Sequence, residues 1–217
     1  SITYNGTIYQ VTGMVAPTNI TAWSSNTVTT EGGAFQSCRI TSISLPTSIT
    51  TISAGAFNGC SNLSSVSLPS NLVSIGAASF AGCNQLQTLE IPETVEAFGS
   101  NSAYGFISYT FGGCTKLKNL NIPNKISTIT NGCFKGCGLD SIYIPQSVRS
   151  LGEESFATNT LRIVKMGVAN LNQLSYTQTT FSNVENIDLY VPKGSLTLYQ
   201  EYEPWSNFKS IQEYGGE

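Results

Sequence analysis

The 217-residue sequence contains no histidine and only two aspartates, Asp140 and Asp188. The absence of histidine excludes Ser-His-Asp and Cys-His catalysis, HExxH-type zinc sites and histidine-based pH switching. An enzyme without histidine would depend on carboxylates, Lys, Tyr or Cys, and the adjacent Glu153 and Glu154 are one candidate carboxylate pair for a hydrolase. Phosphate-binding and Ca²⁺-binding loop patterns are also absent. We therefore predict a protein that is not an enzyme and that uses no cofactor or metal.

Charge is scarce as well. Charged residues make up 11% of the chain, well below the roughly 25% of typical soluble domains. The net charge is −3 and no basic stripe is present, which excludes nucleic acid as a partner. No apolar run of about 18 residues is present that could span a membrane. A surface of Ser, Thr and Asn is common in secreted proteins. We expect a monomer that is extracellular or anchored to a cell surface, with no signal or anchor in this chain.

Two features recur along the chain. The first is a phenylalanine that returns after 22, 23, 31, 23, 22 and 25 residues, at Phe35, Phe57, Phe80, Phe111, Phe134, Phe156 and Phe181. The second is an aliphatic residue followed by proline, at Leu45-Pro46, Leu68-Pro69, Ile91-Pro92, Ile122-Pro123, Ile144-Pro145 and Val191-Pro192. A fixed period of about 23 residues predicts a repeat solenoid.

Each repeat predicts two short strands and one tight turn. In the second repeat, Leu63, Val66 and Leu68 are apolar with serines between them, which indicates a strand with one buried face. Proline ends the strand because it cannot donate the next ladder hydrogen bond. A second extended run follows, and the phrase Ala-Phe-x-Gly-Cys then predicts a helical or 3₁₀ turn left through a glycine with positive φ. One coil cannot bury its apolar side alone, so stacked coils must share a core.

Five cysteines occupy the same phase of successive repeats: Cys38, Cys60, Cys83, Cys114 and Cys137. We predict that they stack inside the coil as free, buried thiols, and that Cys133 is buried as well. A disulfide framework is the alternative, since six is an even number. Parallel Cβ vectors in one row suit the disulfide dihedral angle poorly.

The repeat resembles the BspA-like, treponema-type leucine-rich repeats of bacterial surface proteins. The residues that carry the resemblance are Leu-x-x-Val-x-Leu-Pro from Leu63, Leu-x-x-Ile-Gly from Leu72 and Ser-Phe-Ala-Gly-Cys from Ser79. The resemblance covers roughly residues 33–192, and the tail from Val191 is similar to the closing segment of that family. It implies a right-handed leucine-rich-repeat coil of short parallel strands, and adhesion to host matrix proteins, other cells or glycans.

The chain divides into three parts that we expect to form one structural domain. Residues 1–30 form a β cap, with a hairpin at Asn5-Gly6. Residues 31–192 form the solenoid of about seven coils, with an eight-residue insertion near residues 99–108, where the phenylalanine spacing lengthens to 31. Residues 193–217 form a C-terminal cap. Its helix is predicted from Ser195 as N-cap and from Tyr199, Tyr202, Trp205 and Phe208 at helical spacing.

The candidate binding residues lie in the second half of the chain. Outward strand positions change there from Ser and Thr to larger side chains: Tyr143, Ile163, Lys165, Asp188 and Tyr190. The insertion adds Tyr104 and Phe106, with Tyr109 following. We predict that a protein, such as a host matrix or other cell-surface protein, or a glycan docks here, and whether the insertion or the concave strand face carries the contact stays open. The alternatives are a structural spacer that holds another domain off the cell surface and a carboxylate-based hydrolase.

Overall fold

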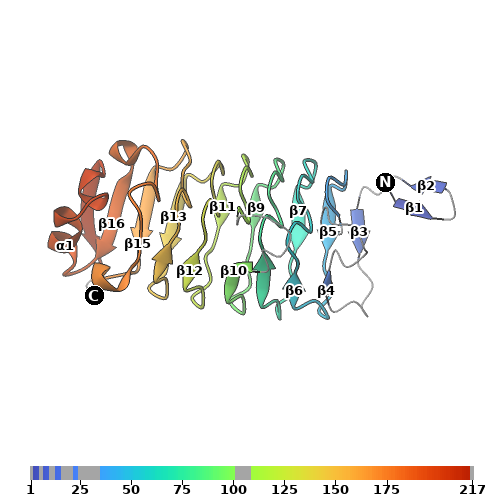
Figure 1. Cartoon of the computed structure of the whole chain (residues 1–217), viewed down its shortest axis with the longest axis horizontal. Coiled ribbons are helices and arrows are strands. Elements are labelled where there is room, and N and C mark those ends of the chain that lie inside the picture. The colour runs from blue at the N-terminus through green and yellow to red at the C-terminus, as the bar shows by residue number, and fades with distance from the viewer. Residues whose placement is uncertain are drawn as a thin grey trace.

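Short parallel strands stack in two rows along an elongated coil (Figure 1). The computed structural model describes residues 2–4, 7–9, 13–15, 22–23, 35–100 and 109–215. The first strand row contains β3 (Gly13–Val15), β5 (Ser42–Ser44), β7 (Ser65–Ser67), β9 (Thr88–Leu89), β11 (Asn119–Leu120), β13 (Ser141–Ile144), β15 (Ile163–Met166), β16 (Asp188–Pro192) and β17 (Ser210–Tyr214). The second row contains β4 (Ala22–Trp23), β6 (Thr51–Ile52), β8 (Ser74–Gly76), β10 (Ala97–Ser100), β12 (Thr128–Ile129) and β14 (Ser150–Leu151).

Neighbouring strands pair in parallel, but neither row is continuous. The first row divides into the sheets β3-β5-β7, β9-β11 and β13-β15-β16-β17. The second row divides into β4-β6-β8-β10 and β12-β14. The break in the second row lies between β10 and β12, where the sequence carries the extra residues. The predicted solenoid architecture is confirmed.

The alternating pattern of each repeat explains its strand. Ile43 is buried between the exposed Ser42 and Ser44, as the two-residue period of a strand requires. The chain then turns at the proline, whose carbonyl accepts a hydrogen bond from the amide three residues later. This bond recurs in five coils at 3.0–3.1 Å, from Ile49, Leu72, Val95, Ile126 and Val148. Proline therefore both ends the first strand and builds the corner that leads to the second run.

The seven recurring phenylalanines form a continuous stack, which we call the Phe spine. Successive ring centroids are 5.3, 5.2, 5.7, 5.4, 5.3 and 5.2 Å apart from Phe35 to Phe181. The five inner rings, from Phe57 to Phe156, are fully buried. The spacing of the rings is close to the roughly 4.8 Å between paired strands, so one ring fits each coil of the stack.

The in-phase cysteines are free thiols beside the Phe spine, as the sequence predicts. Cys38 is half-buried, whereas the other five, Cys133 included, are buried. Each inner thiol donates to the carbonyl of the phenylalanine in the preceding coil: Cys60 to Phe35, Cys83 to Phe57, Cys114 to Phe80 and Cys137 to Phe111, at 2.9–3.4 Å. The thiol therefore links adjacent coils through a bond that Ala or Val could not make.

The N-terminal hairpin is confirmed by the antiparallel pair of β1 (Ile2–Tyr4) and β2 (Thr7–Tyr9). Beyond it, β3 pairs with β5 and β4 pairs with β6, both in parallel. The strand rows thus begin at residue 13, earlier than the boundary at residue 31 that the sequence predicts.

The C-terminal cap differs from the single amphipathic helix that the sequence predicts. Helix α1 covers only Leu196–Glu201, and the short 3₁₀ helix η3 (Trp205–Asn207) follows it. Pro204 separates them, because proline disfavours helical backbone at the residue before it and lacks an amide donor. Ser195 occupies the N-cap position, but its hydroxyl donates to the Pro192 carbonyl and accepts no bond from the helix amides. Two further 3₁₀ helices, η1 (Leu171–Gln173) and η2 (Val184–Asn186), lie in the late coils.

The cap still closes the core, as predicted. Tyr199 and Trp205 are fully buried, and their rings meet edge to face at 5.3 Å. The Trp205 ring also contacts Phe181, the last ring of the spine, at 5.7 Å. The final strand, β17, then pairs with β16 and extends the first row by one strand that the sequence analysis missed.

Candidate functional site

Strand register brings five of the predicted binding residues together. Tyr143, Lys165 and Tyr190 occupy equivalent positions on β13, β15 and β16. Ile163 and Asp188 pair with each other two residues earlier on β15 and β16. Tyr143 and Ile163 are 44% and 41% exposed, and Lys165 is exposed as well. Tyr190 is half-buried. We call Tyr143, Ile163, Lys165, Tyr190 and Tyr214 the aromatic strip.

Tyr214 joins the strip from β17, and nothing in the repeat pattern predicts its place there. The Lys165 ammonium lies 3.9 Å from the centre of the Tyr214 ring, and the Tyr214 hydroxyl donates to the Met166 carbonyl at 2.7 Å. Burial and the neighbouring Tyr143 raise the pKa of Tyr214 above its ordinary value. The strip therefore presents a cation held against the Tyr214 ring, and β17 is required to complete it.

Asp188 is not available as a free carboxylate. Its oxygens accept from the Ser210 hydroxyl at 2.7 Å and from the Lys209 ammonium at 3.0 Å. These two donors, the hydroxyl first, lower the pKa of Asp188 below its ordinary value. Asp188 thus anchors β17 to β16 and supports the strip, with its charge paired to Lys209.

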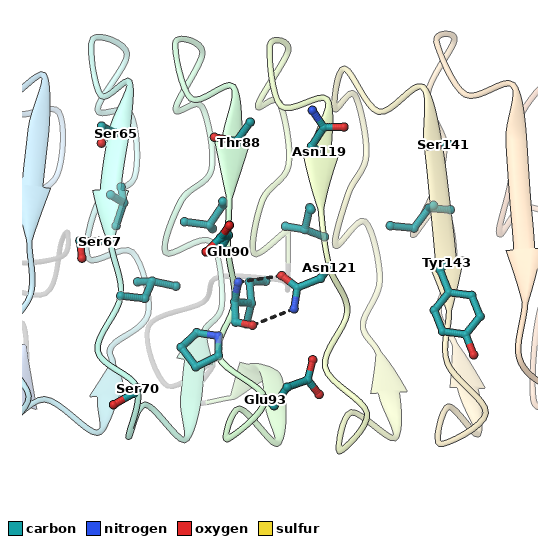
Figure 2. Close-up of a pocket in the computed structure, with 17 residues that line it drawn as sticks. Ser65, Ser67, Ser70, Thr88, Glu90, Glu93, Asn119, Asn121, Ser141 and Tyr143 are labelled. Atoms are coloured by element: carbon teal, nitrogen blue, oxygen red, sulfur yellow. Dashed lines mark hydrogen bonds between the residues drawn. The ribbon is translucent and has the colours of Figure 1, made fainter.

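A second surface lies on the same face, one step toward the N-terminus. A groove of about 1080 Å³ crosses β7, β9, β11 and β13 (Figure 2). Its polar lining consists of small hydroxyl and amide side chains and two carboxylates: Ser65, Ser67, Ser70, Thr88, Glu90, Glu93, Asn119, Asn121 and Ser141. Tyr143 closes the C-terminal end, where the groove adjoins the aromatic strip. We call this surface the hydroxyl groove.

The groove lies over the two breaks in the first strand row. β7 and β9 belong to different sheets, as do β11 and β13. On the N-terminal side of each break the inward-facing residue is only half-buried, Val66 on β7 and Leu120 on β11, whereas Leu89 and Ile142 on the other side are buried. The groove therefore has an apolar floor beneath a polar rim.

Asn121 shows how the strand row is held together beside these breaks. Its side-chain oxygen accepts from the Ile91 amide and its side-chain nitrogen donates to the Ile91 carbonyl, both at 2.8 Å. In the first coils the equivalent bond is made by backbone, from the Leu45 amide to the Ser67 carbonyl at 3.0 Å. The Asn121 amide thus replaces a ladder bond at the edge of the groove (Figure 2).

The residues predicted around the insertion fall elsewhere. Tyr109 has a φ of +52° and belongs to the turn that carries Phe111, not to the first strand row. Its ring packs against Gly112 and Gly132, with the Lys135 ammonium 5.9 Å from the ring centre. The structure does not bring Tyr109 to the aromatic strip. Tyr104 and Phe106 lie outside the described residues.

Several other charged side chains in the described part of the chain form ion pairs between coils. Glu154, half of the carboxylate pair considered above, bonds Lys135 at 2.6 Å. Lys118 pairs with Asp140 and Lys125 with Glu96 in neighbouring coils. No group of three or more potential metal ligands is present among the described residues. None of the helices in this part is long and apolar enough to cross a membrane.

Comparison with known proteins agrees with the solenoid fold. The family model described as the BspA type leucine rich repeat region matches in 6 copies over residues 28–108 and 102–212. The leucine-rich repeat protein of Treponema pallidum is 23% identical with a TM-score of 0.63, over 77% of this chain and 74% of that one. The pneumococcal vaccine antigen PcpA is 20% identical with a TM-score of 0.57, over 94% of this chain and 42% of that one. The chain thus spans less than half of the antigen. Curated protein sequences give no significant match.

Proposed function

The chain belongs to the BspA-type leucine-rich repeat family, and we propose that it is a secreted or surface-anchored binding module without catalytic activity. The observation that carries this proposal is the aromatic strip. Four large hydrophobic side chains are exposed in the described part of the chain, and two of them, Tyr143 and Ile163, lie in the strip. A rigid stack of coils that gathers such side chains on one face is typical of an interaction surface.

The chemistry of the strip favours a protein partner, such as a matrix protein or another cell-surface protein. Tyrosine provides a large rigid contact area with a polar tip, and it is enriched at the centre of protein interfaces. Lys165 is held over the Tyr214 ring, so little side-chain freedom is lost when a carboxylate of the partner approaches it. The neighbouring Asp188 is paired with Lys209 at 3.0 Å, which reduces its repulsion of that carboxylate.

The test is a binding screen of the full chain against purified extracellular-matrix and cell-surface proteins, followed by substitution in the strip. Tyr143→Ala combined with Tyr190→Ala should weaken the affinity for the partner about tenfold, which corresponds to about 1.4 kcal/mol. Tyr202→Ala is the matched control, because Tyr202 is 50% exposed but follows α1 and lies outside the first strand row. Ser42→Ala in β5 should also leave binding unchanged.

Two results would contradict the proposal. If no partner binds above background, the chain acts as a structural spacer, which needs rigidity but no contact surface. If the strip variant binds as well as the Tyr202 control, the interface lies on another face of the solenoid.

A further inference from the structure

We propose that the hydroxyl groove binds a neutral glycan chain. The proposal deepens the binding function above, on which it rests, by adding a second ligand class at a surface of its own. The groove crosses four strands, from Ser65 on β7 to Tyr143 on β13 (Figure 2). Successive coils bring polar side chains to the groove from each of these strands, so polar groups recur along its length.

The rim of the groove matches the hydroxyl groups of a sugar. Each sugar hydroxyl both donates and accepts, and Ser, Thr and Asn side chains do the same whereas carboxylates accept. The side chains of Thr88, Glu90 and Asn119 are exposed and have no hydrogen-bond or ion-pair partner among the described residues. They can therefore bond a ligand without first breaking a bond inside the protein.

The floor of the groove matches the other half of a sugar. A pyranose ring carries apolar C–H groups on its faces, and burying them against apolar side chains is favourable. Val66, Leu68 and Leu120 line the groove and are half-buried. An apolar floor with a hydroxyl and amide rim is the complement of a ring with C–H faces and a hydroxyl edge.

The breaks in the strand row supply additional bonding groups. Strands normally satisfy their amides and carbonyls by pairing, and unpaired groups need water or a ligand. No backbone hydrogen bond joins β7 to β9, or β11 to β13, in the described chain. The facing strand edges beneath the groove therefore offer amides and carbonyls to which sugar hydroxyls can bond, either directly or through water.

Charge and pocket shape decide between ligand classes. Glu90 and Glu93 are the charged residues that line the groove, and no Lys or Arg does. A sialylated, sulfated or phosphorylated chain would meet like charge here, so a neutral glycan is favoured. A peptide is disfavoured because Tyr143 is the one large exposed hydrophobic side chain in the lining, and peptide recognition needs pockets for alternate side chains.

The experiment is to apply the full chain to an array of neutral, sialylated and sulfated oligosaccharides, then to measure affinity for the best neutral oligosaccharide by calorimetry. We expect retention of neutral oligosaccharides and none of the sulfated or sialylated ones. Preference for anionic oligosaccharides, or no retention of any neutral one, would overturn the proposal.

Substitutions separate the groove from the aromatic strip. Ser67→Trp places a large ring in the groove from an exposed position on β7. It should weaken the affinity for the neutral oligosaccharide about tenfold or more. Thr88→Ala with Asn119→Ala removes rim groups and should act in the same direction. Ser44→Trp is the matched control, since Ser44 is the equivalent exposed residue on β5 and does not line the groove.

Tyr190→Ala makes failure of the two proposals distinguishable. It should weaken binding of the protein partner at the strip and leave the affinity for the oligosaccharide unchanged, because Tyr190 does not line the groove. Loss of glycan binding in Tyr190→Ala, or its retention in Ser67→Trp, contradicts the groove proposal. A chain that binds protein through the strip but no neutral glycan retains the proposed function and lacks the groove activity.

Discussion

Replacing Phe80 by alanine tests whether the Phe spine holds the solenoid together. Phe80 is fully buried, and its ring centroid lies 5.2 Å from that of Phe57 and 5.7 Å from that of Phe111. Substitution of a buried Phe by Ala costs about 3–5 kcal/mol, because apolar contact is lost and a cavity remains. The loss falls on both coil interfaces at once, since each coil of a solenoid contacts its two neighbours.

The structure places the expected cost in the upper half of that range, at about 4–5 kcal/mol. The cavity cannot close by bringing coils together, because backbone bonds fix their separation on both sides. The Phe57 amide donates to the Ser79 carbonyl at 2.7 Å, and the Phe80 amide donates to the Thr110 carbonyl at 2.9 Å. Phe80→Leu, which keeps much of the volume but loses the ring stacking, should cost about 1–2 kcal/mol.

The assay is urea denaturation followed by circular dichroism and by tryptophan fluorescence, to which Trp23 and the buried Trp205 both contribute. Coincident transitions from the two signals permit a two-state free energy. Val73→Ala is the control, because Val73 is 42% exposed and a surface change of this kind stays within about 0.5 kcal/mol. A cost below about 1 kcal/mol for Phe80→Ala would refute the role of the spine.

Three further predictions concern thiols, pH and backbone. Titration of the native protein should label the half-buried Cys38 first and the other thiols slowly, and denaturation without reductant should expose all six; intact-mass evidence for two or more disulfides would contradict the free-thiol ladder. Burial raises the pKa of Cys60 from 9.0 to about 12, so between these pH values the native state keeps a proton that the unfolded state loses, and the free energy of unfolding should fall as pH rises from 9 toward 12. Cys60→Ala should make the free energy of unfolding fall less steeply with pH, and an unchanged dependence would assign the loss to other groups. Gly132→Ala should lower the melting temperature far more than Gly194→Ala. Both glycines have positive φ, but an added Cβ at Gly132 meets the Tyr109 ring at 2.4 Å, whereas an added Cβ at Gly194 meets nothing within 4 Å. Equal melting temperatures would show that the Tyr109 ring does not pack against Gly132.

Much of the fold is predictable from the sequence because repetition makes weak signals add. A single Phe or Cys predicts little, but seven in-phase phenylalanines and five in-phase cysteines require stacked coils, and the structure places them so. The aliphatic-proline phrase likewise fixes the end of each first strand. Local phrases that occur once are less informative, which is why the cap helix was predicted too long and β17 was missed.

The candidate site was predictable only in part. Outward strand positions follow from the two-residue period, and register then brings Tyr143, Lys165 and Tyr190 together. Tyr214 could not be added, because its strand belongs to the tail and pairs with β16 from outside the repeat. The hydroxyl groove could not be predicted either, since periodicity implies an unbroken strand row and the breaks beside β9 and β11 depend on packing between coils.

Hydroxyl-radical footprinting tests the central claim, that the first strand row is the binding face. Four large hydrophobic side chains are exposed in the described chain: Tyr143 and Ile163 on the first strand row, and Val73 and Tyr202 away from it. Oxidation of each is measured by mass spectrometry for the free protein and for its complex with the protein partner. We predict that the partner protects Tyr143 and Ile163 and leaves Val73 and Tyr202 oxidised as in the free protein. Protection of Val73 or Tyr202 with unchanged oxidation of Tyr143 and Ile163 would contradict the account.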